Sequence, residues 1–78
     1  LEASGATDAA VFGIGATLHH VLTGWQGRYA DGTPALGALR PDCADELSAV
    51  IARALASDPA ARWRDPVVLR QALLRLPQ

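Results

Sequence analysis

The stretch TDAAVFGIGATLHHVLTG, residues 7–24, decides the fold of this chain. From residue 9 to residue 26 the chain contains no Asp, Glu, Lys or Arg, and apolar residues recur at the three- and four-residue steps of one helix face. The other side carries Phe12, Ala16 and two glycines, and a helix without a polar side is a buried one. We therefore expect a central helix over residues 7–24, which ends at Gly24.

Composition limits the classes of protein to which these 78 residues can belong. They fit one small domain, and the charge-free stretch is shorter than the about 20 residues that a membrane-spanning helix needs. The formal net charge is −1 without a basic cluster, which argues against a nucleic-acid or membrane partner. Cys43 is the single cysteine, so we expect no internal disulfide and a reducing, cytoplasmic location. Leu1 is not an initiator methionine, and we expect the native start to lie upstream.

The rest of the chain predicts an all-α fold with three main helices and a short turn. No strand-like alternation occurs, whereas apolar residues recur at helical spacing in two later segments. Glycine and proline are frequent between the first two helices and favour an irregular loop there. We expect a lead-in loop at 1–6, the central helix at 7–24, an irregular loop at 25–41, a second helix at 42–57, a turn at 58–64 and a third helix at 65–77.

Two Asp-Pro pairs give the clearest start signals. Asp58-Pro59 and Asp65-Pro66 each place an N-cap residue before a proline, whose missing N–H costs nothing at the first helical position. The first pair opens a short turn and the second opens the last helix. Trp63, between them, is interpreted as the side chain that joins the second helix to the third.

Polar residues are expected to begin the two earlier helices as well. Thr7 or Asp8 can accept hydrogen bonds from the free N–H groups of the first turn, and Asp42 or Cys43 starts the second helix. A structural role is therefore expected for Cys43.

No catalytic, cofactor or metal site can be assembled from the sequence. His19 and His20 point about 100° apart on a helix, and neither has the further ligands that a zinc site needs. Gly13 and Gly15 lie inside the helix and follow no strand, so they lack the context of a phosphate-binding loop. We interpret the histidines as packing residues and the glycines as a place where another backbone comes close.

Four motifs in order resemble the C-terminal part of a bacterial eukaryotic-like serine/threonine protein kinase. They are VFGIGATLHHVLTG at 11–24, LRPD at 39–42, ELSAVIARALASD at 46–58 and PAAR at 59–62. The resemblance implies that the first motif is the central F helix of the large lobe. It implies likewise that the second motif leads into the H helix and that the third motif is the H helix itself. DPAAR would then be the D-P-x-x-R turn, and the last helix would be the I helix.

The resemblance also implies that the catalytic parts of the family are missing from this chain. The Gly-rich loop, the phosphate-pairing lysine, the H-R-D loop and the D-F-G metal ligand all lie upstream of the matching segment. Ala10 stands where the family has an aspartate that holds the catalytic loop, so the parent is a kinase or a pseudokinase. The sixteen residues between Gly24 and Pro41 are too few for a full G helix.

Arg62 is the candidate structural tie, together with Asp58. In the family, the arginine of D-P-x-x-R pairs with the glutamate of A-P-E, which this chain lacks. A buried guanidinium without a carboxylate is costly, so Arg62 is expected to find Glu2, Asp58 or Asp65. The alternative is a surface arginine with a weak local pair.

Two functions follow from this sequence. The first is a non-catalytic scaffold segment of a kinase-like domain, which by itself is no enzyme. The alternative is an independent helical adaptor derived from a kinase lobe; a small metal-dependent enzyme has almost no support. Both functions imply a protein partner: the rest of a kinase domain, a second copy or another subunit. The candidate interface residues are Phe12, Ala16, His19 and Trp25, although Trp25 can instead anchor the loop beside Tyr29.

Overall fold

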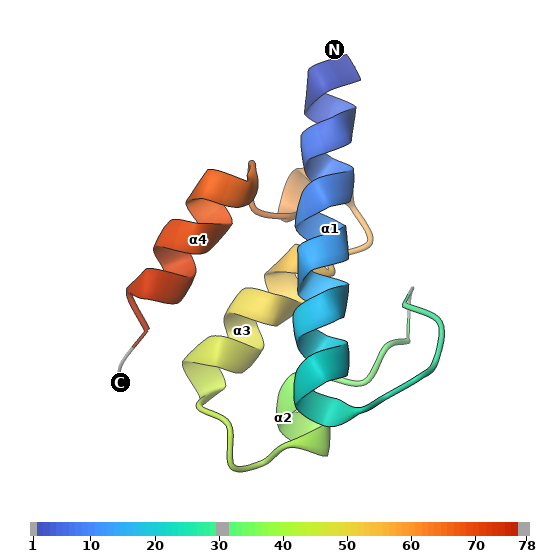
Figure 1. Ribbon diagram of the computed structural model, residues 1–78, viewed down its shortest axis with the longest axis vertical. Helices are drawn as coiled ribbons and strands as arrows, with labels where there is room; N and C mark the ends of the chain where they lie inside the picture. The colour runs from blue at the N-terminus through green and yellow to red at the C-terminus, as the bar shows by residue number, and fades with distance from the viewer. Residues whose placement is uncertain (1, 30–31, 77–78) are drawn as a thin grey trace.

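The computed structural model describes residues 2–29 and 32–76, and for residues 2–8 it describes the backbone alone. Within these residues the chain forms helices and no strand, so the all-α prediction is confirmed (Figure 1). The elements, in chain order, are α1 (Glu2–Thr23), α2 (Leu36–Leu39), α3 (Asp45–Ala54), the 3₁₀ turn η1 (Pro59–Ala61) and α4 (Pro66–Leu74).

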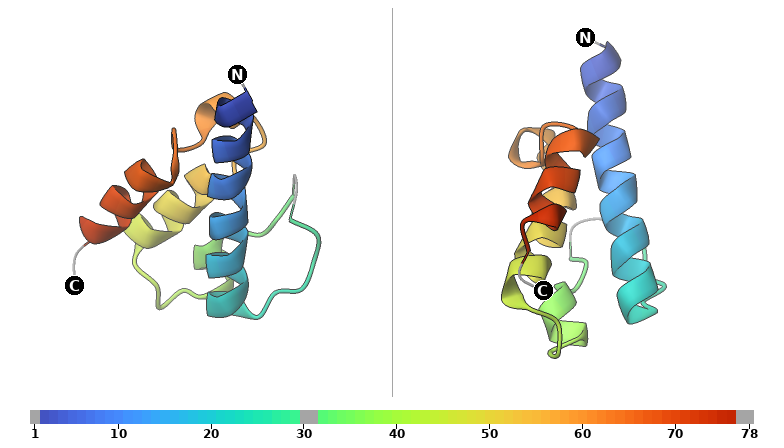
Figure 2. Two further views of the ribbon diagram at one scale, coloured as in Figure 1. Left: turned by 45° about the horizontal axis from the view of Figure 1, so that its top comes forward. Right: turned by 60° about the vertical axis from the view of Figure 1, so that its left-hand side comes forward.

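The long helix α1 is the element around which the others are arranged. Helices α3 and α4 pack beside it, α2 lies near its C-terminal end, and its N-terminal end projects beyond the other helices (Figures 1 and 2). The loop that follows α1 swings away from the helix and returns to α2 (Figure 1).

The bounds of α1 differ from the prediction at one end. The helix begins at Glu2, so the expected lead-in loop at 1–6 is wrong, and Thr7 and Asp8 lie inside the helix rather than at its cap. No proline occurs in this segment to stop a helix from extending toward the N-terminus. The other end is confirmed, because Gly24 follows Thr23 with a φ of 72°, the left-handed conformation that glycine adopts easily.

The second and third predicted helices are present, but both are shorter than predicted: α3 is Asp45–Ala54 and α4 is Pro66–Leu74. The loop at 25–41 contains the short helix α2. The second helix begins at Asp45 rather than at Asp42 or Cys43, and its N-cap, Ala44, has no capping side chain. Asp42 does not cap it because its carboxylate binds Arg40.

Both Asp-Pro start signals are confirmed. Asp58 accepts a hydrogen bond from the N–H of Ala60 at η1, and Asp65 accepts one from the N–H of Val68 at α4. Each proline takes the first position of its element, where it gives up no intrahelical bond.

The core lies where α1, α3 and α4 meet. Its buried cluster consists of Val11, Val50, Ala54 and Leu69. Trp63 packs against this cluster and donates from Nε1 to the carbonyl of Val50 at 2.9 Å, which confirms its role between α3 and α4. The guanidinium of Arg53 lies over the same indole, 4.1 Å from the ring centre.

One row of residues on α1 faces this core. The row that is exposed to solvent is not the one that the sequence predicted. Val11, Gly15 and His19 are buried, whereas Ile14 is 38% exposed and Val21 is 72% exposed. At Gly15, α3 comes so close that an added Cβ would lie 2.8 Å from the Cβ of Ala54, and Gly13 has open space beside it. The expected close approach therefore occurs at Gly15, where side chains of α3 rather than a backbone come near, and the prediction is wrong at Gly13.

We predict opposite effects for two glycine-to-alanine substitutions in α1. Gly15→Ala overpacks the contact with α3 and should lower the free energy of unfolding by about 1–3 kcal/mol. Gly13→Ala meets no atom and gains helix propensity, so it should raise that free energy by about 0.5–1 kcal/mol. Urea titrations followed by circular dichroism measure both. Equal shifts for the two variants would contradict this packing of α1 on α3.

Candidate functional site

His19 of α1 is buried and contacts the loop that joins α1 to α2. Its side chain is 1% exposed, and both ring nitrogens have partners: Nε2 lies 2.8 Å from the carbonyl oxygen of Pro34 and Nδ1 lies 2.7 Å from the hydroxyl of Tyr29. A carbonyl only accepts, so these partners assign the proton to Nε2, and the Tyr29 hydroxyl donates to Nδ1. One side chain of α1 thus binds the following loop at two positions, Tyr29 and Pro34.

Three rings pack together at this contact. His19, Trp25 and Tyr29 meet edge to face in all three pairs, with ring centres 4.9–5.7 Å apart. Trp25 also folds over Gly27, where an added Cβ would lie 2.1 Å from the indole. Desolvation raises the pKa of Tyr29 above its ordinary value, so its hydroxyl remains a donor. The anchoring role of Trp25 and Tyr29 is confirmed.

The candidate interface is only partly at the surface. His19 is enclosed, so the expectation that it contributes to an exposed interface is wrong: its two nitrogens are used inside the molecule. Phe12, Ala16 and Trp25 are half-buried, and their interface role stays a prediction. Five exposed residues of α1 instead form an open face, which consists of Ala10, Gly13, Ile14, Thr17 and Val21. Ala9 and His20 are also exposed and border this face.

Arg62 ties the turn to its surroundings without a carboxylate. Nε donates to the carbonyl of Ala56 at 2.7 Å, and the guanidinium lies over the ring of Phe12, 4.9 Å from its centre. Among the described residues Arg62 forms no ion pair, and the side chain of Glu2 lies outside them. The expected pairing with Asp58 or Asp65 is wrong, because both carboxylates accept backbone N–H groups instead.

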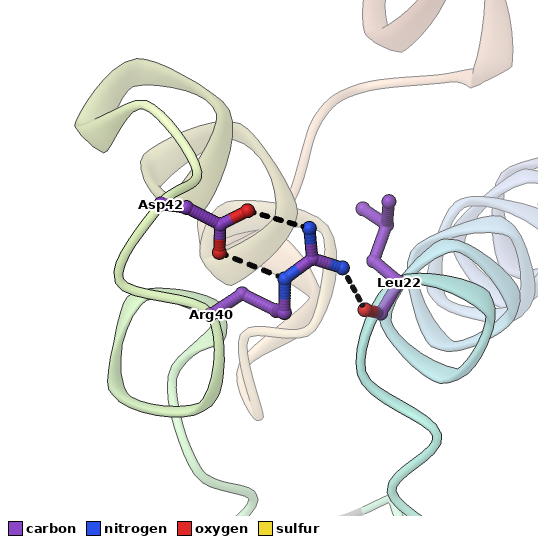
Figure 3. A network of polar contacts seen from close by, with 3 residues as sticks. All are labelled: Leu22, Arg40 and Asp42. Carbon is purple, nitrogen blue, oxygen red and sulfur yellow. Dashed lines mark hydrogen bonds and ion pairs between the residues drawn. The ribbon is translucent and has the colours of Figure 1, made fainter.

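A second tie, which sequence reasoning missed, closes the C-terminal end of α1. Arg40 donates from Nε and Nη2 to the carboxylate of Asp42 at 2.8 and 2.7 Å, and from Nη1 to the carbonyl of Leu22 at 2.7 Å (Figure 3). Leu22 is in the last turn of α1, where carbonyls lack intrahelical partners. The hydrogen bonds from Arg40, joined by a backbone hydrogen bond, lower the pKa of Asp42 to about 2. The short spacing of Arg40 and Asp42 was the available signal.

One cavity of about 220 Å³ lies between the returning loop and the end of α3. Its lining includes His19, Pro34, Leu36, Ile51 and Leu55. This volume is below the about 300 Å³ at which small-molecule sites usually begin. Across the described residues, no three His, Cys, Asp or Glu side chains gather as metal ligands. The contacts that the structure shows around His19, Arg62 and Arg40 are ties between elements of the fold.

Comparison of the chain with protein-family models, curated proteins and solved structures found no match in any of the three. No helix in the described part of the chain has the length and apolar character needed to cross a membrane. The kinase resemblance therefore stays a prediction from the motifs.

We predict that His19 holds the loop in place. His19→Leu removes both ring partners and leaves the carbonyl of Pro34 without its donor, so the free energy of unfolding should fall by about 1–3 kcal/mol. The near-ultraviolet circular dichroism of Trp25 should weaken, because its ring loses a packed neighbour. His20 is the matched control, since it is exposed and makes a single bond to the carbonyl of Trp25. An equal effect of His20→Leu would contradict the role of His19.

We predict an acid-sensitive contribution from the Arg40–Asp42 pair. The folded-state pKa of Asp42 is about 2, below the ordinary value of 3.8, so its stabilising effect is present above about pH 4 and is lost as the pH falls toward 2. Asp42→Asn should therefore lower Tm at neutral pH, and the difference from the parent chain should shrink toward pH 2. Asp45→Asn is the control, because its carboxylate forms no ion pair within the described residues. A difference that stays constant with pH would contradict this assignment.

Proposed function

We propose that this chain is a non-catalytic scaffold segment of a serine/threonine protein kinase-like domain, with α1 in the place of the F helix. The observation that carries the proposal is the open face of α1. Ala10, the position that the resemblance aligns with the aspartate that holds the catalytic loop, lies on this exposed face with Ile14 and Val21. In this proposal the open face is where the rest of the lobe packs.

The local chemistry of this face supports an apolar protein contact. Its residues are alanine, glycine, isoleucine, threonine and valine, and residues 9–26 carry no Asp, Glu, Lys or Arg. An exposed apolar helix face without charge is more typical of an interface than of a surface selected for water. The chain also has no lysine that could pair with nucleotide phosphates, so its own contribution is structural.

The turn at Asp58 adds independent support. Asp58 caps η1, and Arg62 reaches from the end of the turn to the ring of Phe12 on α1. The D-P-x-x-R motif thus ties its segment to the central helix, as a lobe scaffold requires. The alternative, an independent adaptor, uses the same open face for a partner outside any kinase.

The test uses the reading frame upstream of Leu1. We predict that it encodes the catalytic motifs, and that this upstream segment, produced as a separate polypeptide in the same cells, copurifies with the chain. Ile14→Glu with Val21→Glu should abolish copurification by placing two charges in an apolar contact. Ala38→Glu with Ala52→Glu, at exposed positions of α2 and α3, is the matched control and should leave copurification unchanged. An upstream frame without kinase motifs would refute the scaffold and leave the adaptor.

A further inference from the structure

The outer side of α4 combines apolar and cationic side chains. Val67 is 60% exposed and Leu74 is 67% exposed, and seven residues of helix place them about 20° apart around its axis. Arg70 and Arg75 lie on the two flanks of this pair, and both are exposed. Within the described residues neither arginine forms an ion pair or a hydrogen bond through its side chain. We call these four residues the basic face of α4.

The beginning of α3 has the opposite charge. Asp45 and Glu46 are exposed in its first turn, and their carboxylates also have no partner among the described residues. Leu39, which is 40% exposed, precedes them at the end of α2. An exposed apolar side chain thus precedes the acidic charges in the chain.

The end of α4, which carries Leu74 and Arg75, lies at the same edge of the molecule as the start of α3. The start of α3 and the end of α4 are neighbours in each of the three views, and the last turns of α4 pack against the core cluster that contains Val50 of α3 (Figures 1 and 2). A surface that carries both halves of a complementary contact can pair with itself across a two-fold axis. Each copy then supplies one basic and one acidic half.

We infer that a second copy of this chain docks here, with the basic face of α4 on the acidic start of α3 in both directions. Charge complementarity sets the register and speeds the encounter, and the exposed leucine and valine side chains supply the apolar contact. The inference does not use the open face of α1 and is independent of the proposed function.

Other partners fit this edge less well. A nucleic acid or an anionic membrane would meet the carboxylates of Asp45 and Glu46 beside the arginines, on a chain of net charge −1. The exposed apolar residues between the arginines have no counterpart in a phosphate backbone. A second copy can instead place the arginines of one chain opposite the carboxylates of the other.

The experiment is a charge swap followed by sedimentation velocity. The parent chain should form a dimer whose association weakens at high salt, and Arg70→Glu with Arg75→Glu should weaken it more than about tenfold, because like charges then face each other. Asp45→Arg with Glu46→Arg should do the same. An equimolar mixture of the two variants should restore the dimer, which also shows that both variants are folded.

The control carries the same net charge as the first variant and leaves this edge intact. This control, Arg28→Glu with Arg64→Glu, changes two exposed arginines elsewhere, so the control chain should still form a dimer with itself. Mixed with the Asp45→Arg, Glu46→Arg chain, the control chain should not form the mixed dimer that the Arg70→Glu, Arg75→Glu chain forms. A parent chain that is monomeric at high micromolar concentration overturns the inference. A dimer that survives both swaps also overturns it, as does binding of the parent chain to anionic vesicles or to single-stranded DNA at low salt in place of self-association.

Discussion

The constraint on which the rest of the structure depends is one row of α1, formed by Val11, Gly15 and His19 at successive four-residue steps. Each member does a different thing on the same side of the helix. Val11 enters the core, Gly15 admits the side chains of Ala54 and Leu55 to close contact, and His19 binds the returning loop. Because the three share a row, the packing of α3 and the position of the loop are fixed together.

Side chains that donate to main-chain carbonyls reinforce this small core. His19, Arg40 and Trp63 reach carbonyls that are 13 to 18 residues away in the sequence. A chain of 78 residues buries a modest share of its surface, so specific polar ties matter more than in a large domain. Each donor gives a carbonyl a hydrogen bond and at the same time connects two elements. A buried carbonyl without a hydrogen bond would lower the stability of the fold.

The sequence predicted what depends on local chemistry and missed what depends on tertiary contact. The caps at Asp58 and Asp65 and the stop at Gly24 follow from neighbouring residues, and all three are confirmed. The orientation of α1 was not predicted, because in a helix without a polar side the apolar periodicity does not single out the buried row: Ile14 and Val21 follow that periodicity and are exposed. His19 was interpreted as a packing residue, which its burial confirms, but its place among the interface residues was wrong: two partners in the loop, ten and fifteen residues further along, hold it inside.

The molecule has two candidate contact surfaces, and the chemistry of each favours a different kind of contact. The open face of α1 has no charge, so a contact there depends on apolar burial and should be insensitive to salt. The edge formed by α3 and α4 carries opposite charges, so a contact there should form quickly and weaken as salt increases. A permanent contact within a kinase-like lobe suits the first surface, and reversible pairing of two copies suits the second. Because the surfaces belong to different helices, occupying one leaves the other accessible.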